Sequence, residues 1–267
     1  MKKDYHVHAQ ILRDSMRAEQ FIQNAIARGF GEICITDHMP VSVSSASDRI
    51  PSGMVKDYCE GVRALARKFE DRISVRLGIE IDYHPSLTAE IEDVLGQGDF
   101  DYVLGSSHLH IFKGVYVSES VSRNQYAAAM LENTVRAAES GYFSAIAHMD
   151  MYRWIFTWSG ARPQLIDDGF SEERHADAIE AALRAIRDGG LYLEINPHFA
   201  QSSKQLANTY PSPTILQKAL EMGVRMSYGS DAHHPEDVGV LWDELVCHPI
   251  YGHALAQWKE TSVGDNT

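Results

Sequence analysis

Histidine and acidic residues follow the short apolar stretches of this chain, and side chains of these types can bind metal ions. His6 and His8 close the first stretch, and Asp37 and His38 close the second. The whole series, in chain order, is His6, His8, Asp37, His38, Glu80, His108, His148, Asp231 and His233. Mixed imidazole and carboxylate ligation suits Zn, Fe or Mn. If each stretch is a strand of one barrel, the strand ends meet and could form a site for several metal ions.

His6 and His8 are two positions apart, which on a strand puts both side chains on one face. Two neutral imidazoles on one face can hold a single divalent ion. Glu80 has two carboxylate oxygens and could bridge two ions, and Asp231 could ligate or bridge in the same way. These four residues therefore predict at least one metal position and a bridge to a second.

Other histidines extend the predicted site. His108 and His148 could hold a second ion with Glu80, and His38 and His233 could hold a third with one acidic residue. For any one histidine the alternative is a hydrogen-bonded structural residue. That alternative explains the whole set poorly, because burying so many titratable groups together costs free energy unless they are compensated.

Segments typical of strands and helices alternate along the chain. We expect strands at residues 4–8, 32–36, 74–81, 102–107, 144–147, 191–196 and 225–228. We expect helices at residues 17–28, 54–70, 87–97, 121–140, 172–187 and 213–222. Alternation of this kind favours a parallel sheet, and seven units indicate an α/β fold with one distorted seven-stranded (β/α)7 barrel. Chemistry in such barrels lies at the carboxyl ends of the strands. We expect a single domain over residues 1–267, because no flexible linker divides the chain.

Composition limits the classes of partner. The formal net charge of −13 disfavours binding to nucleic acid or to a membrane surface by bulk attraction. It does not exclude an anionic substrate, because bound cations dominate the local field of a metal site. No apolar run approaches the ~20 residues of a membrane span, so we expect a cytoplasmic protein, with homo-oligomers left open. Cys34, Cys59 and Cys247 lack the spacing of a metal or redox motif.

Eight short stretches, taken in order, are similar to those of one known family. They are Asp4-Tyr5-His6-Val7-His8, Ile35-Thr36-Asp37-His38, Gly78-Ile79-Glu80-Ile81-Asp82-Tyr83-His84-Pro85, Asp101-Tyr102-Val103-Leu104-Gly105-Ser106-Ser107-His108, Ala147-His148-Met149-Asp150, Leu193-Glu194-Ile195-Asn196, Tyr210-Pro211-Ser212-Pro213 and Gly229-Ser230-Asp231-Ala232-His233. The chain thereby resembles the PHP (polymerase and histidinol phosphatase) superfamily, specifically its histidinol-phosphate phosphatase type. The resemblance extends from Asp4 to about Gly239.

The resemblance implies a distorted seven-stranded barrel and a site for two to three divalent metal ions. By position it assigns His6, His8, Glu80 and Asp231 to the first ion, Glu80, His108 and His148 to the second, and His38 and His233 to the third. Relatives usually have a further histidine for the third ion, where this chain has Asp14. Asp14 could ligate through oxygen, or it could be an acid that caps the following helix.

The resemblance also implies where basic residues would contact the substrate. Relatives often carry an arginine after the asparagine of the sixth strand, but none follows Asn196 here. Lys204 could replace that arginine, although its ammonium is a point charge and not a bidentate fork. Arg153 lies where relatives often have a basic residue and is the preferred candidate for binding phosphate, with a solvated loop arginine as the alternative. His198 could face the site or the solvent.

Residues 151–170 contain three large aromatic side chains, Trp154, Phe156 and Trp158. Beside a metal site, a long aromatic loop could form one wall of a substrate pocket. The alternative is a local hydrophobic cluster beneath the loop.

The resemblance implies a metal-dependent phosphomonoester hydrolase that converts L-histidinol phosphate and water to L-histidinol and phosphate, a step of histidine biosynthesis. Two ions roughly 3.5–4 Å apart can activate a bridging water as hydroxide near neutral pH. Glu80 would be essential, and Asp231 or His233 could assist the leaving alkoxide. The alternatives are a phosphatase for another small metabolite or a phosphodiester, a deacetylase or amidohydrolase, and a non-catalytic regulatory module.

Overall fold

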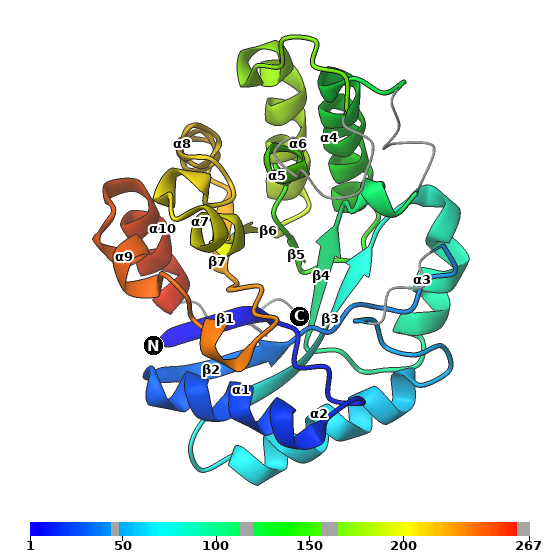
Figure 1. The fold of residues 1–267 in the computed structure, drawn as a ribbon, viewed down its shortest axis with the longest axis vertical. Coiled ribbons are helices and arrows are strands. Elements are labelled where there is room, and N and C mark those ends of the chain that lie inside the picture. The colour runs from blue at the N-terminus through cyan, green and yellow to red at the C-terminus, as the bar shows by residue number, and fades with distance from the viewer. Residues whose placement is uncertain (44–47, 113–119, 156–164, 261–267) are drawn as a thin grey trace.

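The computed structural model describes the chain except for residues 44–47, 113–119, 156–164 and 261–267 (Figure 1). Its seven strands are β1 (Lys2–Val7), β2 (Phe30–Ile35), β3 (Ser74–Asp82), β4 (Tyr102–Ser106), β5 (Ala145–Ile146), β6 (Tyr192–Ile195) and β7 (Arg225–Tyr228). They form one sheet in the order β1 to β7, and every neighbouring pair is parallel. The predicted (β/α)7 fold is confirmed.

The first and last strands meet at the carboxyl end of the sheet and nearly close the barrel. Val7 forms a parallel bridge with Ala232, and the His8 N–H donates to the Ala232 carbonyl at 2.9 Å. The Asp231 N–H donates to the carbonyl of His6 at 2.8 Å. Deeper in the same junction, the buried Asp4 carboxylate accepts from the backbone N–H groups of two residues beyond β7. The junction therefore sets residues after β7 beside residues of β1.

Helices cover the outside of the barrel (Figure 1). They are α1 (Ser15–Ala27), α2 (Val55–Phe69), α3 (Thr88–Leu95), α4 (Arg123–Glu139), α5 (Tyr152–Ile155), α6 (Ala176–Asp188), α7 (His198–Ser203), α8 (Pro213–Glu221), α9 (Trp242–Cys247) and α10 (Pro249–Glu260). Short 3-10 helices lie at Pro85–Leu87, Leu109–Ile111, Glu172–His175, Leu206–Asn208 and Pro235–Asp237. All six predicted helices are present, and 172–187 begins as a 3-10 turn. Among the described residues, no helix is both long and apolar enough to span a bilayer.

The last helix, α10, was not predicted, although it packs against the barrel. Its Tyr251, Leu255 and Trp258 are fully buried. The Trp258 ring lies 4.9 Å from the ring of Tyr5 and 5.5 Å from that of Tyr192, measured between centroids. Pro249 at the first position and apolar residues four and three apart are the signals that could have identified this helix.

Candidate metal centre

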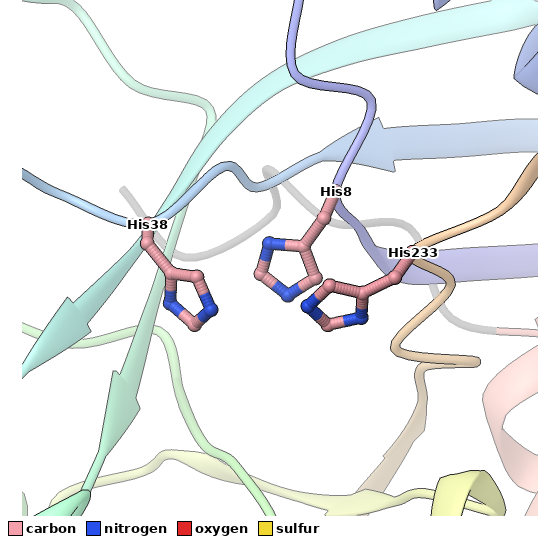
Figure 2. A group of neighbouring side chains, drawn as sticks. All are labelled: His8, His38 and His233. Carbon is pink, nitrogen blue, oxygen red and sulfur yellow. The ribbon is translucent and has the colours of Figure 1, made fainter. Parts of the chain in front are cut away.

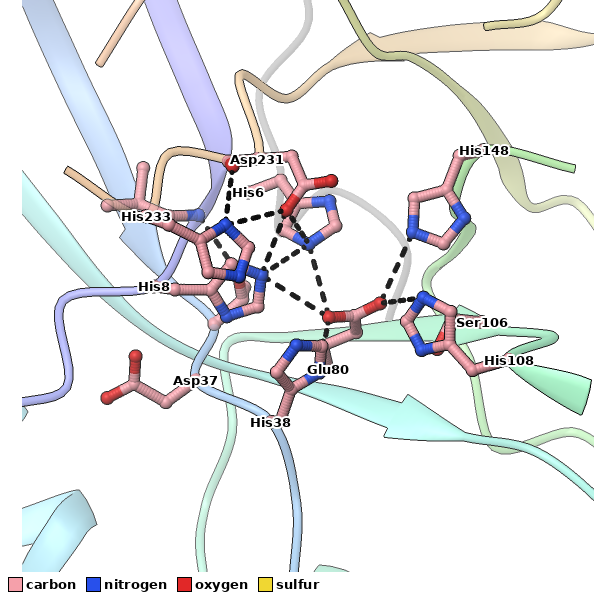
Figure 3. Close-up of polar contacts among 12 residues, drawn as sticks. His6, His8, Asp37, His38, Glu80, Ser106, His108, His148, Asp231 and His233 are labelled. Carbon is pink, nitrogen blue, oxygen red and sulfur yellow. Dashed lines mark hydrogen bonds and ion pairs between the residues drawn. The ribbon is translucent and has the colours of Figure 1, made fainter. Parts of the chain in front are cut away.

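All the predicted ligands except Asp14 converge at the carboxyl ends of the strands (Figure 3). His6 lies near the end of β1 and Glu80 near the end of β3, whereas the others follow directly or closely after a strand. Backbone pairing explains part of this convergence. The Glu80 N–H donates to the Asp37 carbonyl at 3.2 Å, and the Met39 N–H donates to the Glu80 carbonyl at 2.9 Å. His38 is therefore held beside Glu80 by the same hydrogen bonds that extend the sheet.

Glu80 lies between two groups of histidines, and each of its oxygens faces one group (Figure 3). Oε2 is 2.8 Å from His38 Nδ1, 3.3 Å from His6 Nε2 and 3.4 Å from His8 Nε2. Oε1 is 3.4 Å from His148 Nε2 and 3.8 Å from His108 Nε2. The Glu80 side chain is fully buried. This is the arrangement expected of a carboxylate that bridges two cations.

Asp231 approaches the first group from β7. Its Oδ1 lies 3.2 Å from His8 Nε2, 3.6 Å from His6 Nε2 and 3.5 Å from His233 Nδ1. Its backbone has a φ of 56°, and His148 also has a positive φ, 24°. Non-glycine residues rarely adopt such angles, and where they do the surrounding structure must hold them there. Two of the predicted ligands are thus fixed in strained backbone conformations.

Several subsets of these side chains could each hold a metal ion. In each subset, one ligand atom per residue lies within 4.8 Å of the others: His6/His8/Glu80, His6/His148/Asp231, Glu80/His108/His148, His8/His38/His233 and His38/Asp82/His108. Figure 2 shows that His8, His38 and His233 face one another. Glu80 Oε1 is buried without a hydrogen-bond partner, so a cation at this position would satisfy it. The residues therefore fit a multi-metal site.

The electrostatics of the centre favour bound positive charge. Burial raises the pKa of Glu80, but His38, His6 and His108 more than offset this and hold it well below its usual range. The pKa of Asp231 is likewise well below its usual range, because His6 and His198 outweigh the effect of burial. Burial lowers the pKa of His38, but Glu80 reverses this effect and raises it to about 9. The carboxylates of the centre thus stay ionised and attract cations.

Two carboxylates beside the predicted ligands were not identified from the sequence. Glu194, on β6, lies with Oε1 2.6 Å from His6 Nδ1. Asp82, on β3, lies with Oδ1 2.6 Å from His108 Nδ1 and also pairs with Arg49. Carboxylates that accept from the second nitrogen of a metal-binding histidine fix its orientation. The signal that could have revealed them is an acidic residue at a strand position that is otherwise apolar or next to a ligand.

Asp37 has a different role from its neighbour His38. Its carboxylate accepts from the backbone N–H groups of Gln10 at 2.9 Å and Ile11 at 3.3 Å. Burial raises its pKa to about 6. Asp37 therefore shapes the loop that follows His8.

The structure places Asp14 at the helix-capping position. Its exposed side chain accepts from the Arg17 N–H at 3.0 Å at the start of α1. Asp14 belongs to none of the five subsets above, and the residue that joins His38 and His233 is His8. The capping alternative describes the contact that is observed, and a role for Asp14 as a ligand of the third ion stays a prediction.

Arg153 makes four hydrogen bonds within the protein that were not predicted. Nη1 donates to Asp150 Oδ2 at 3.0 Å and to the Thr209 carbonyl at 3.1 Å. Nη2 donates to the Ala207 carbonyl at 2.8 Å and to Asn208 Oδ1 at 3.3 Å. Four acceptors occupy the four hydrogens of the two terminal nitrogens. Arg153 thus clamps the loop before Tyr210, and a role for Arg153 in binding phosphate stays a prediction.

The two other predicted substrate contacts differ in position. His198 begins α7 at the edge of the centre, with Nδ1 3.2 Å from the Asp231 carbonyl and its ring centroid 5.7 Å from that of His233. Of the alternatives for His198, facing the site is the one observed. Lys204 is exposed at the C-cap of α7 with a φ of 55°. A role for Lys204 in binding phosphate stays a prediction.

Of the three aromatic side chains predicted for this loop, only Trp154 lies within the described residues. Trp154 is half-buried and packs against the hydrophobic core, as the cluster alternative predicts. Phe156 and Trp158 lie outside the described residues.

Comparison with known proteins agrees with this architecture. Residues 4–198 match the PHP domain family. The chain is 31% identical over 256 residues to "Probable histidinol-phosphatase" of Deinococcus radiodurans, covering 91% of this chain and 90% of that protein. It is 24% identical to "Histidinol-phosphatase" of Bacillus subtilis, covering 92% of this chain and 98% of that protein.

A solved structure shares the fold. It is the histidinol phosphate phosphatase of Lactococcus lactis complexed with Zn, L-histidinol and phosphate. Its TM-score to this chain is 0.70 at 20% sequence identity, covering 88% of this chain and 87% of that one. Likeness at this identity concerns the arrangement of strands and helices.

Proposed function

The chain belongs to the PHP domain family, and we propose that it is a metal-dependent phosphomonoester hydrolase acting on L-histidinol phosphate. The observation that carries the proposal is the position of Glu80, whose two oxygens each face a group of buried histidines. The choice of histidinol phosphate is supported by the relatives named histidinol-phosphatase. The alignment with the Bacillus subtilis protein covers 92% of this chain and 98% of that protein. The products are L-histidinol and phosphate.

We propose that the centre holds two to three divalent ions of Zn, Fe or Mn. His6, His8 and Asp231 would hold one at the Oε2 side of Glu80, and His108 and His148 one at the Oε1 side. The group His8, His38 and His233 could hold a further ion. Zn is favoured by the likeness to the lactococcal enzyme that is complexed with Zn. Bound ions of this kind supply a water of lowered pKa and stabilise charge on the phosphoryl oxygens.

Residues of this chain could also protonate the leaving alkoxide and contact the substrate. Asp231 is the poorer candidate for protonating the leaving alkoxide, because its low pKa keeps it ionised at neutral pH. In a centre that holds two ions and leaves His233 free of metal, His233 is the better candidate by position, since its side chain is 31% exposed and the Asp231 side chain 13%. His198 lies beside both and could contact the substrate from the β6 side.

A second candidate function is hydrolysis of another small phosphorylated metabolite at the same centre. It is favoured by two observations: Arg153 is tied to four protein acceptors, and the segment from Asn196 to Tyr210 contains no arginine. Recognition of phosphate by arginine is therefore weaker here than the resemblance implies. A non-catalytic module is disfavoured, because the buried imidazoles and carboxylates form a complete potential site. A cytoplasmic location and a role in histidine biosynthesis are parts of the main proposal.

A phosphate-release screen on metal-analysed protein tests the proposal. We expect L-histidinol phosphate to give the highest kcat/KM among phosphorylated amino alcohols, sugars and nucleotides. A higher kcat/KM for another monoester, with only weak turnover of L-histidinol phosphate, would favour the second candidate. No phosphate release from any substrate, including p-nitrophenyl phosphate, at stoichiometric metal would contradict both.

A further inference from the structure

Glu194 is a buried carboxylate on β6 that contacts two different predicted ligands. Oε1 lies 2.6 Å from His6 Nδ1, and Oε2 accepts from the backbone N–H of His148 at 3.1 Å. Asn196 Nδ2 donates to the same Oε2 at 3.0 Å and reaches Asp231 Oδ2 at 3.3 Å. The side chain of Glu194 is 1% exposed. One carboxylate thus connects ligand-bearing segments at the ends of β1 and β5, and through Asn196 also the segment after β7.

The fold makes space for this carboxylate at Gly229, directly after β7. A Cβ at that position would overlap both Glu194 Oε1 and His6 Cβ. Gly229 has no positive φ, so close approach and not backbone conformation is what requires glycine here. The glycine of the Gly229-Ser230-Asp231 stretch therefore serves the contact between Glu194 and His6.

We propose that Glu194 is a positioning residue that fixes the tautomer of His6 and keeps His6 in register with His148. A neutral imidazole has one N–H, and an ionised carboxylate can only accept, so the proton of His6 belongs on Nδ1. His6 Nε2, which lies 3.3 Å from Glu80 Oε2, then presents its lone pair to a metal ion. The inference rests on the proposed function only in requiring that the centre binds divalent ions.

Asp82 differs from Glu194 in what it holds. Its Oδ1 contacts His108 Nδ1 at 2.6 Å, and its other oxygen pairs with Arg49. Asp82 therefore orients one histidine on the Oε1 side of Glu80. Glu194 orients His6 on the Oε2 side and the backbone of His148 on the Oε1 side. Loss of Glu194 should thus disturb both ends of Glu80, whereas loss of Asp82 should disturb one.

The substitution Glu194→Gln separates this role from simple packing. An amide has an acceptor at one end and a donor at the other, whereas Glu194 accepts at both ends. The variant must therefore either lose the contact to the His148 N–H or face His6 Nδ1 with a donor, which moves the His6 proton to Nε2 and withdraws that nitrogen from a metal ion. We expect its affinity for Zn to fall about 10- to 100-fold, which is the usual effect of removing a partner of a metal ligand. Competition between the metal-free protein and a chromophoric chelator for Zn measures this.

Glu32→Gln is the matched control. Glu32 is a buried carboxylate on β2 that pairs with Tyr5 and Arg76, away from the carboxyl ends of the strands. We expect its Zn affinity to equal that of the wild type. An equal loss in both variants would overturn the proposal, because the effect would then reflect burial of any glutamate. Wild-type Zn affinity in Glu194→Gln would also overturn it.

A spectroscopic measurement needs no variant. Long-range ¹H–¹⁵N NMR of the Zn-loaded wild-type protein should show His6 protonated at Nδ1 and bound to metal through Nε2. The reverse assignment would overturn the proposal even if Glu194→Gln failed to fold. If the wild type bound no metal, the proposed function would fail as well. Normal Zn binding by the wild type with an insensitive Glu194→Gln would remove this inference alone.

Discussion

Two sides of the barrel's carboxyl end hold their side chains in different ways: a first wall, the candidate metal-binding wall around His6 and Glu80, and a second wall of loops around Arg153 and Lys204. On the first wall, His6 and Glu80 extend from strands, and hydrogen bonds of the sheet fix their neighbours. On the second wall, beyond β5 and β6, Arg153 and Lys204 belong to short helices and loops. Strand positions are set by register, whereas the loop side chains are set by individual hydrogen-bond partners that can lie far away in the sequence. The first wall is therefore the one whose chemistry can be read from the sequence.

The largest effect that sharpens this comparison is expected for Glu80→Ala. The change removes both oxygens that face the two groups of histidines. We expect metal content to fall and kcat to drop on the order of 10³-fold, since charge stabilisation and water activation both depend on bound metal. Metal analysis and steady-state kinetics measure this. Full activity at wild-type metal content would contradict the assignment of the first wall.

The next largest effect is expected for Arg153→Ala, and it should be an effect on stability. Removing the guanidinium leaves the Asp150 carboxylate buried without its cation and frees the loop before Tyr210. We expect the free energy of unfolding to fall by about 3 kcal/mol, measured by urea denaturation. A large rise in KM with unchanged stability would instead place Arg153 against the phosphate and break the comparison.

A smaller effect is expected for Asp14→Ala. Loss of the cap on the Arg17 N–H should lower the free energy of unfolding by about 1 kcal/mol. Metal content and kcat should not change, because the carboxylate is engaged with the helix. The loss of one ion per chain would restore Asp14 as a ligand.

The smallest effect is expected for Glu172→Gln, and it depends on pH. Burial and the nearby Asp150 raise the pKa of Glu172 in the folded protein. Ionisation therefore costs stability above both the folded and the unfolded pKa, and the cost disappears as the pH falls below the unfolded value. We expect the variant to be more stable by less than about 1 kcal/mol at pH 7, with no gain near pH 4. A gain that was equal at both pH values would contradict this cause.

Sequence patterns predicted the strands because these follow from local alternation of segments. They also predicted that the histidines at the strand ends converge, because the carboxyl ends of parallel strands lie at one end of the barrel. They did not reveal Glu194, whose role depends on the distance from β6 to β1 across the barrel. The family resemblance indicated Arg153 for phosphate, and the sequence did not reveal its other partners because, Asp150 apart, they lie more than fifty positions away in the chain. Sequence patterns left Asp14 between two roles that only its contact to Arg17 distinguishes. Long-range partners of single side chains are what the sequence could not supply.

Phosphate release from L-histidinol phosphate, followed in one preparation through removal and restoration of metal, tests the central claim most directly. We predict that the protein as isolated holds two to three divalent ions per chain and hydrolyses this substrate. Chelation should abolish the activity while the fold persists by circular dichroism, and added Zn, Fe or Mn should restore it. Undiminished hydrolysis by protein shown to be free of metal would contradict the account.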